Sequence, residues 1–370
     1  MVFLRKILTN CLLLEYTSME NQFMLDILFS IDLERAMFQK VLPTGWVCLS
    51  ILGVSLVRAN ALPADPAGLL AKSTPISPEE TLNDAASYYI RGLVRYNDGD
   101  FKGAIEDLTQ ALTLDPAYVE AYLYRGFIYS QQGDRTGAAA DYNTAIALDP
   151  ERASAYFYRG LLGNADAISD FDRAIELDPD YAEAYRHRSI ARRQNRDLSG
   201  ALADSDRAIA LAPDYADAYY TRGNTRLDLG DYPGAISDLN QAISLKGFYP
   251  EAYISLGIAR DRLGDLQGAI DAYSQAIDLD PDFAVAYYNR GILHAQLGNY
   301  QKAIANFTAA IDIDPNYAEA YFNRGAVRNN QLGDIDGAIA DLQTAADLYQ
   351  RQGNADAAQH ALDRLHAIRR

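Results

Sequence analysis

Charged side chains recur at fixed places in this chain of 370 residues, and their spacing favours ion pairing over catalysis. Arginine fills one place in seven copies of a repeated motif: Arg91, Arg125, Arg159, Arg188, Arg222, Arg290 and Arg324. Aspartate fills a second place in six copies: Asp107, Asp141, Asp170, Asp204, Asp238 and Asp341. The sixth copy has Leu256 and Ala272 there, and the seventh has Asn306 in the aspartate's place. We predict that arginine and aspartate pair between two helices of one repeat; shared descent of the copies is the alternative explanation.

Residue patterns typical of catalysis or metal binding are missing from the sequence. It has no phosphate-binding loop and no Gly-x-Ser-x-Gly nucleophile turn. The four histidines, His187, His294, His360 and His366, lack metal-ligand spacing, and both cysteines, Cys11 and Cys48, precede the repeats. We therefore expect a protein that is not an enzyme and that has no cofactor and no metal site.

The charge balance argues against nucleic acid as a partner. The formal net charge is −17, and residues 1–61 are balanced, so the acidic excess lies after residue 61. Nucleic acids and anionic membrane surfaces select clustered Lys and Arg, which an acidic body does not supply.

The charged positions belong to a repeat that predicts a pair of helices. Each copy has two recurrent alanines, and the second of them falls at residues 111, 145, 174, 208, 242, 276, 310 and 345. Most successive copies are therefore 34 residues apart. In the first copy, Tyr88, Gly92 and Tyr96 share one helical face, and Gly99 breaks that helix. A second helix then has apolar residues at three- and four-residue spacing, and Asp115-Pro116 stops it. A single hairpin cannot bury its apolar face, so the copies must stack.

Small and aromatic residues at fixed places identify the family that the repeat resembles. Glycine recurs in seven copies, at Gly92, Gly126, Gly160, Gly223, Gly257, Gly291 and Gly325, and the fourth copy has Ser189. We interpret these glycines as places where two helices approach closely. With the aromatic, alanine and proline places, the unit resembles the tetratricopeptide repeat, in eight copies over residues 85–350. The resemblance implies an all-α fold, a right-handed α-solenoid of helix–turn–helix repeats. It also implies a non-catalytic scaffold that binds another protein, as a peptide or a helix, in a concave groove.

The resemblance places the groove on the first helix of each repeat. A tyrosine recurs at one place in all eight copies and is interpreted as a packing anchor: Tyr88, Tyr122, Tyr156, Tyr185, Tyr219, Tyr253, Tyr287 and Tyr321. The residue after each of these tyrosines, and the residue one helical turn later, are expected to face the groove. The predicted groove residues are Tyr89, Leu93, Leu123, Phe127, Phe157, Leu161, Arg186, Ile190, Arg193, Tyr220, Asn224, Ile254, Ile258, Tyr288, Ile292 and Phe322. The alternative is that part of this largely apolar stripe packs against adjacent helices.

The third and fourth copies depart from the others. The third is five residues short between Gly160 and Ala167, which predicts a shortened first helix and turn, and hence a notch. The fourth has a basic first helix, with Arg186 and Arg193 on one face. We expect either a docking point for an anionic element or arginines neutralised by carboxylates such as Asp180 and Glu183.

The N-terminal part reads as an export signal behind an extension. Residues 37–61 combine a positively charged start, an apolar run and the small residues Ala59 and Ala61, which predicts signal cleavage after Ala61 and a periplasmic or secreted protein. The alternatives are an uncleaved membrane tether over Val41 to Val57 and a cytosolic co-chaperone or regulatory adaptor. Residues 1–36 are interpreted as an over-extended start or an N-terminal extension.

The repeats are flanked by a linker and a cap. Residues 62–84 form a proline-rich linker and the start of the first helix, with Ser77 as its N-cap. Residues 351–370 are predicted to form a capping helix, with Leu362, Leu365 and Ile368 on the stack and Arg364 in water.

Overall fold

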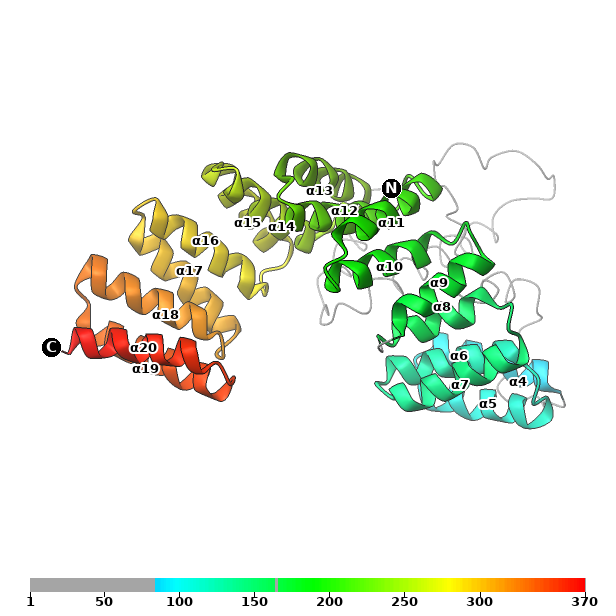
Figure 1. The fold of residues 1–370 in the computed structure, drawn as a ribbon. Coiled ribbons are helices and arrows are strands. Elements are labelled where there is room, and N and C mark those ends of the chain that lie inside the picture. The colour runs from blue at the N-terminus through cyan, green and yellow to red at the C-terminus, as the bar shows by residue number, and fades with distance from the viewer. Residues whose placement is uncertain (1–83, 164–165, 370) are drawn as a thin grey trace, which may run out of the picture. The chain divides into compact units, whose positions relative to one another are not determined.

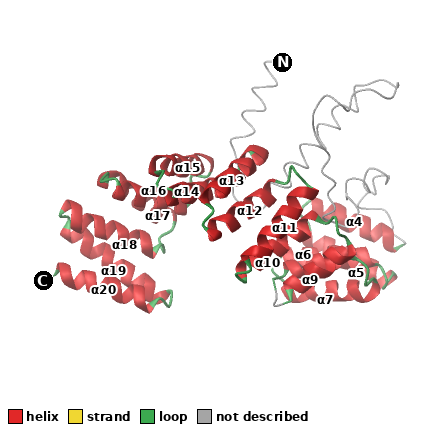
Figure 2. Cartoon of the chain, turned by 45° about the horizontal axis from the view of Figure 1, so that its top comes forward, coloured by secondary structure: helices red, strands yellow, loops and turns green. Residues whose placement is uncertain are grey.

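The structure, a computed structural model, describes residues 84–163 and 166–369. Over these residues it consists of helices joined by short loops, with no strand (Figures 1 and 2). The first helices of the repeats are α4 (Ala85–Asn97), α6 (Val119–Gln131), α8 (Ala153–Leu161), α10 (Ala182–Gln194), α12 (Ala216–Leu229), α14 (Pro250–Arg262), α16 (Ala284–Gln296) and α18 (Ala318–Val327). The second helices are α5 (Phe101–Leu114), α7 (Arg135–Leu148), α9 (Ala167–Leu177), α11 (Leu198–Leu211), α13 (Tyr232–Lys246), α15 (Leu266–Leu279), α17 (Tyr300–Ile313) and α19 (Ile335–Arg351).

Packing between helices follows the order of the chain. Each second helix packs on the first helix of its own repeat and on the first helix of the next repeat. The core is therefore a row of small apolar clusters, each built mainly by adjacent repeats. This arrangement confirms the predicted all-α class, a right-handed α-solenoid of helix–turn–helix repeats.

In the Gly-Asp pair between the two helices of a repeat, the glycine ends the first helix and the aspartate caps the second. Gly99 has a φ of 79°, the left-handed conformation that ends α4. Asp100 then caps α5, because its carboxylate accepts the backbone N–H of Gly103 at 2.9 Å. The same aspartate cap starts α7, α11, α13, α15 and α19. In the fourth repeat Arg196 takes the place of the glycine and has a φ of 64°.

The glycine in each first helix admits the facing helix at close range, as predicted. A Cβ on Gly126 would lie 2.8 Å from Cε1 of Tyr142, and one on Gly160 would lie 2.7 Å from Cε1 of Phe171. In the fourth repeat Ser189 replaces the glycine, and the residue that faces it is the small Ser205 instead of an aromatic or leucine. The fit of small against large side chains therefore sets the distance between the two helices of a repeat.

The short third repeat loses length from both of its helices. Helix α8 has 9 residues and α9 has 11, against 13 and 14 in the preceding repeat. The predicted shortening of the first helix is confirmed, while the shortening of the second helix was not predicted.

The eighth repeat accommodates one extra residue without a change in its pairing. After α18 the chain forms a π-helix, η1 (Arg328–Leu332). The N–H of Asp334 donates to the carbonyl of Arg328, six residues back, whereas Asp231 donates to Arg226, five residues back. The insertion is therefore taken up as a wider helical turn.

The last helix, α20 (Ala355–Ile368), packs against α19. Asn354 caps it, and Ala358, Ala361 and Leu365 are its buried residues. Arg364 was expected in water, but its guanidinium lies over the ring of Phe322, 5.5 Å from the ring centroid. That contact is a correction: the arginine packs on an aromatic ring, which His360 also contacts, instead of extending into water.

The predicted export signal, linker and Ser77 cap lie outside the described residues. The first described helix is α4, with Asp84 as its N-cap. Among the described helices, none has both the length and the apolar character needed to cross a bilayer.

Candidate protein-binding groove

The arginine–aspartate pairs are present, as predicted, between the two helices of a repeat. In the fifth repeat, Nε and Nη2 of Arg222 donate to the two carboxylate oxygens of Asp238 at 2.9 and 2.6 Å. The same two-pronged pairs join Arg91 to Asp107, Arg125 to Asp141, Arg159 to Asp170, Arg188 to Asp204 and Arg324 to Asp341. In the seventh repeat Arg290 donates to the amide oxygen of Asn306 at 2.9 Å. These arginines therefore serve the scaffold.

The same arginines also tie each repeat to the one before it, which the sequence reading missed. Nη1 of Arg188 donates to Asp172 of the third repeat at 2.7 Å. Equivalent bonds join Arg125 to Thr109, Arg159 to Asn143, Arg222 to Asp206, Arg290 to Ser274 and Arg324 to Thr308. A polar residue two places after the paired aspartate is the sequence signal that marks these acceptors.

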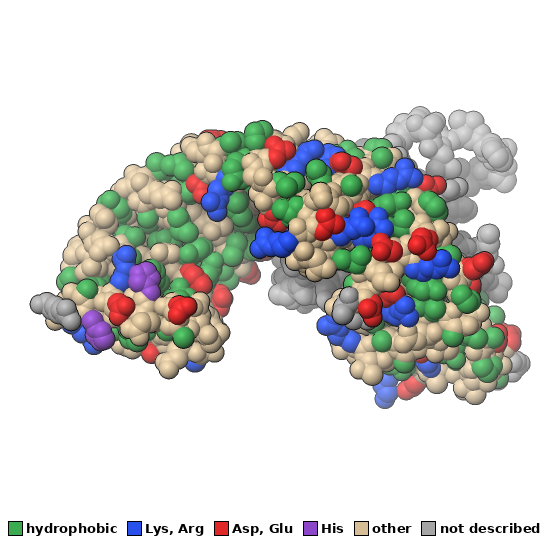
Figure 3. All heavy atoms as spheres, viewed as in Figure 1, with side chains coloured by type: hydrophobic (Ala, Val, Ile, Leu, Met, Phe, Trp, Pro, Cys, Tyr) green, Lys and Arg blue, Asp and Glu red, His purple; other side chains and the backbone are tan. Residues whose placement is uncertain are grey.

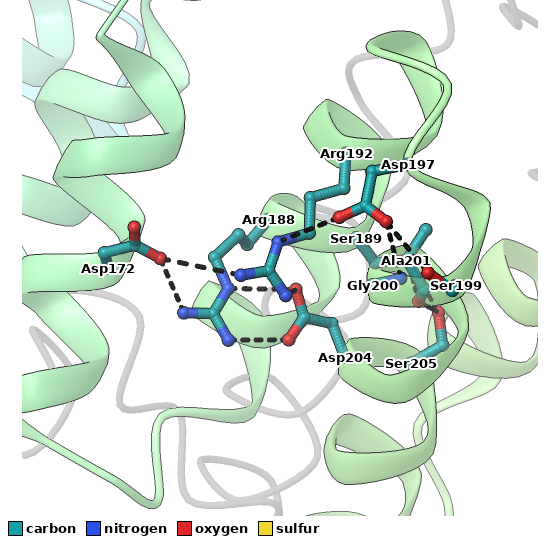
Figure 4. Close-up of polar contacts among 10 residues, drawn as sticks. All are labelled: Asp172, Arg188, Ser189, Arg192, Asp197, Ser199, Gly200, Ala201, Asp204 and Ser205. Atoms are coloured by element: carbon teal, nitrogen blue, oxygen red, sulfur yellow. Dashed lines mark hydrogen bonds and ion pairs between the residues drawn. The ribbon is translucent and has the colours of Figure 1, made fainter.

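A second arginine, one helical turn after the first, forms an additional ion pair with the carboxylate in four repeats. In the fourth repeat Arg188 and Arg192 converge on Asp204 from α10, and Arg188 also reaches Asp172 (Figure 4). The other second arginines are Arg95, Arg226 and Arg328. On the face drawn in Figure 3, Lys and Arg are accordingly interspersed with Asp and Glu and do not form a single basic patch.

The first row of predicted groove residues consists of those directly after the recurrent tyrosines. This row packs against the next repeat. The ring of Tyr89 lies 4.9 Å from that of Tyr118, just ahead of α6. Equivalent ring pairs join Phe157 to Tyr181, Tyr220 to Tyr249 and Tyr288 to Tyr317. Tyr89, Leu123, Phe157 and Ile254 are buried, and Tyr220, Tyr288 and Phe322 are partly buried. These side chains help to stack the repeats, and their contact with a partner stays a prediction.

The second row of predicted groove residues lies one helical turn after the first, and its side chains are more exposed to solvent. Leu93 and Asn224 are buried, and the Asn224 amide oxygen accepts a bond from Ser255 at 2.9 Å. The others are accessible: Phe127, Ile190, Ile258 and Ile292 are partly buried and Leu161 is exposed. This row therefore supplies the apolar surface that a partner could reach from solvent.

The two groove arginines of the fourth repeat differ in their pairing. Nη1 of Arg193 lies 3.3 Å from Asp228, whereas Asp180 pairs with Arg207. Arg193 is thus neutralised, but by a carboxylate of the next repeat. Within the described ranges Arg186 forms no ion pair, so neither expected carboxylate neutralises it.

Neutral groups hold Arg186 in place. Its Nε donates to the Tyr215 hydroxyl at 2.7 Å, its Nη2 donates to Nε2 of His187 at 2.7 Å, and its guanidinium lies over the Tyr215 ring. Burial, with the Arg186 charge, lowers the pKa of His187 to about 3, so the imidazole is neutral and can accept. Although burial opposes it, hydrogen bonding from Tyr249 and the charges of Lys246 and Arg186 lower the pKa of the nearby Asp217. The groove therefore holds an oriented guanidinium that forms no ion pair with the described residues, although its charge acts on Asp217 at longer range.

Cavities lie beside the third and eighth repeats, which differ in length from the usual 34 residues. Phe127, Arg135, Tyr142, Tyr158, Leu161 and Leu162 line much of a cavity of about 320 Å³ beside the end of α8. Two further cavities, of about 240 and 480 Å³, flank the π-helix and share Ala326 and Asn330. The predicted notch thus has a counterpart, but its lining cation is Arg135 and neither Arg186 nor Arg193 lines it. Within the described ranges no three His, Cys, Asp or Glu side chains are grouped to hold a metal ion.

Comparisons with known proteins agree with this architecture. Models of the family described as TPR repeat match residues 92–133, 128–162 and 262–298. Models described as tetratricopeptide repeat match residues 162–216, 216–248 and 284–317. Together these matches cover more than half of the chain. A search of curated proteins found no match.

Several solved structures are similar to parts of the chain. The crystal structure of MamA is 28% identical, with 45% of this chain and 96% of MamA covered, at a TM-score of 0.42. A chain of the Cut9–Hcn1 hetero-tetramer of APC/C is 20% identical, with 71% of this chain and 52% of that one covered, at a TM-score of 0.53. Yeast Tom70 is 19% identical, with 80% and 66% covered, at a TM-score of 0.52. The last two likenesses support the fold alone.

Proposed function

The chain belongs to the tetratricopeptide repeat family, and on that premise we propose that it is a non-catalytic scaffold whose groove binds a peptide or helix of another protein. The single observation that carries the proposal is Arg186, a groove cation without an ion pair among the described residues. Most other arginines on the first helices are engaged by carboxylates of the scaffold. A guanidinium held in place by Tyr215 and His187 is pre-organised for a carboxylate from outside.

The apolar second row supports the same proposal. Phe127, Ile190, Ile258 and Ile292 remain partly accessible, and Leu161 is 42% exposed. Apolar side chains of this kind along one face suit an amphipathic helix or an extended peptide. We therefore propose a partner segment that combines apolar side chains with at least one carboxylate, which binds Arg186.

Affinity capture tests the proposal. The purified protein would be used as bait, and the captured proteins would be compared with those held by Arg186→Ala. Arg207→Ala is the matched control, because Arg207 lies on a second helix and is 46% exposed beside Asp180. We expect Arg186→Ala to lose a partner that the control retains, with weaker capture at higher salt. An unchanged set of partners for Arg186→Ala would overturn the assignment.

We further propose that the scaffold acts after export, in the periplasm or outside the cell, or held at a membrane by an uncleaved signal. The basis is the signal-like sequence of residues 37–61. N-terminal sequencing of the protein from its native cells tests this, since export with cleavage predicts a start at Leu62. An intact start together with a cytosolic fraction would favour a cytosolic co-chaperone or regulatory adaptor instead.

A further inference from the structure

The cavity beside the end of α8 exists because the third repeat is short. Helix α8 ends at Leu161, whereas the first helices of most repeats continue for one more turn. The missing turn leaves a space bordered by α6, α7 and the end of α8, with a volume of about 320 Å³. We call this space the notch pocket and define it by Phe127, Arg135, Tyr142, Tyr158, Leu161 and Leu162.

Aromatic rings form much of the notch pocket. The rings of Tyr142 and Tyr158 are stacked with centroids 5.9 Å apart, and Phe127 meets Tyr158 edge to face at 6.1 Å. Leu161 is 42% exposed beside them, although it is a large apolar residue. Tyr142 and Tyr158 are themselves buried, so Phe127 and Leu161 supply the more accessible part of the wall. An aromatic side chain suits this wall, because aromatic pairs gain from both burial and ring geometry.

A cation stands at the edge of this apolar wall. Arg135 is the first residue of α7, and the same place in six other repeats is apolar: Phe101, Leu198, Tyr232, Leu266, Tyr300 and Ile335. Arg135 is exposed and forms no ion pair with the described residues. Its Nη2 would lie 3.5 Å from a Cβ on Gly163, so the guanidinium reaches the end of the shortened helix. The charge and the missing turn therefore occur at one spot.

We propose that the notch pocket seats an aromatic side chain of the partner segment, and that Arg135 binds a carboxylate next to it in that segment. This inference rests on the proposed function, because it names one subsite of the same groove. The occupant follows from charge and shape: the apolar wall favours an apolar anchor, and a guanidinium that forms no ion pair with the described residues favours an anion. Phe127 and Leu161, which belong to the second row of groove residues, would contact the anchor.

Methyl NMR with short peptides tests the proposal directly. The full chain, labelled at leucine methyl groups, would be titrated with the peptide Gly-Ser-Asp-Phe-Asp-Ser-Gly. Two further peptides replace Phe by Ala, or both Asp by Lys. We expect only the first peptide to shift the Leu161 and Leu162 methyl signals, with millimolar affinity. Arg135→Gln should weaken that binding about tenfold, the size expected for one charge-assisted hydrogen bond.

Matched variants separate the notch pocket from the rest of the surface. Leu161→Gln should abolish the peptide-induced shift at Leu162, whereas Leu229→Gln, at a leucine that is 49% exposed, should leave it unchanged. Arg262→Gln, at another exposed arginine, is the control for Arg135→Gln. Circular dichroism would verify that each variant folds.

Three results would overturn the inference. They are no shift at Leu161 and Leu162, equal shifts with the Ala peptide, and shifts that appear on raising the protein concentration without peptide, which would assign the pocket to a second copy of the chain. A negative peptide titration would overturn the notch pocket proposal and leave the Arg186 capture result intact. A positive titration, together with unchanged capture by Arg186→Ala, would remove the anion contact at Arg186 and keep the notch pocket.

Discussion

Nη1 of Arg222 lies 2.7 Å from the carboxylate of Asp206, so an arginine of the fifth repeat is bound to the second helix of the fourth. The same guanidinium holds Asp238 in its own repeat through its other two nitrogens. The pair predicted within a repeat is therefore one half of a contact that spans two repeats. Loss of Arg222 should weaken both the hairpin and the stacking of its neighbours.

Removal of Asp238 alone should be costly, and removal of both partners should cost less than the sum. Asp238→Ala removes the buried carboxylate that Arg222 and Arg226 share. Because Arg222 keeps Asp206, we expect a loss of unfolding free energy near the lower end of about 3–5 kcal/mol. Adding Arg222→Leu reproduces the Leu256 and Ala272 of the sixth repeat and should recover at least about 1 kcal/mol. Urea unfolding measures this coupling. The exposed pair Arg207 and Asp180 is the control, with an expected coupling below about 1 kcal/mol; strict additivity at Arg222 and Asp238 would contradict the prediction.

Ser189 and Ser205 should behave as a matched pair. Their hydroxyl oxygens lie 2.7 Å apart, and both are fully buried where other repeats place a glycine against a large side chain. Ser205→Leu should cost about 1–3 kcal/mol, because leucine overfills the space beside Ser189. Adding Ser189→Gly should restore much of that loss by recreating the pairing of Gly223 with Leu239. Thermal and urea unfolding provide the measurement; a double variant no more stable than Ser205→Leu would show that the two sites are independent.

Arg196→Gly should stabilise the protein. Arg196 has a φ of 64° in a turn where other repeats have glycine, and left-handed backbone costs an ordinary residue about 1–2 kcal/mol. Part of that gain is offset by glycine's larger entropy in the unfolded chain, so we expect a net gain of up to about 1 kcal/mol. The reverse change at the matched turn, Gly230→Arg, should destabilise. An unchanged melting temperature for both variants would show that these turns tolerate either residue.

Stability should fall as the pH is lowered from about 6.5 towards 3, partly because of His187. Its pKa is about 3 in the folded protein and near its ordinary value of 6.5 when unfolded, so the unfolded chain binds the extra proton in this window. The slope is at most about 1.4 kcal/mol per pH unit for one proton. His187→Gln keeps an acceptor for Arg186 and should flatten the profile of unfolding free energy. His366→Gln, at an exposed histidine, should not. Equal profiles for all three proteins would rule out His187 as the cause.

The sequence was sufficient for the repeat, its helices and the arginine–aspartate pair, because each of these is fixed by local spacing. The copies of the repeat could also be compared with one another. The sixth copy lacks both the arginine, replaced by Leu256, and the aspartate, replaced by Ala272, and this joint loss indicated that the two residues are in contact. The bond from Arg188 to Asp172 was missed because its acceptor lies in another repeat and differs in type from copy to copy.

The groove could be read only in part. The position of a residue in the first helix predicts the face on which its side chain lies. The exposure of that side chain depends on another residue, the one just before the first helix of the following repeat. Tyr118 therefore covers Tyr89, while Tyr215 meets an arginine. The place of Arg135 beside the notch pocket was also missed, because the pocket forms only where α8 is short, from the packing of three helices.

The π-helix at Arg328–Leu332 has a consequence for how this array can change over evolutionary time. One inserted residue widens a single helical turn, and Arg328 still donates to Asp341 at 2.8 Å. The joint at the end of the first helix thus tolerates insertion and deletion, while the side-chain pair below it preserves the repeat. Because cavities flank this joint in both the third and the eighth repeats, gain or loss of a few codons there would reshape the proposed binding surface while the remaining repeats stay in register.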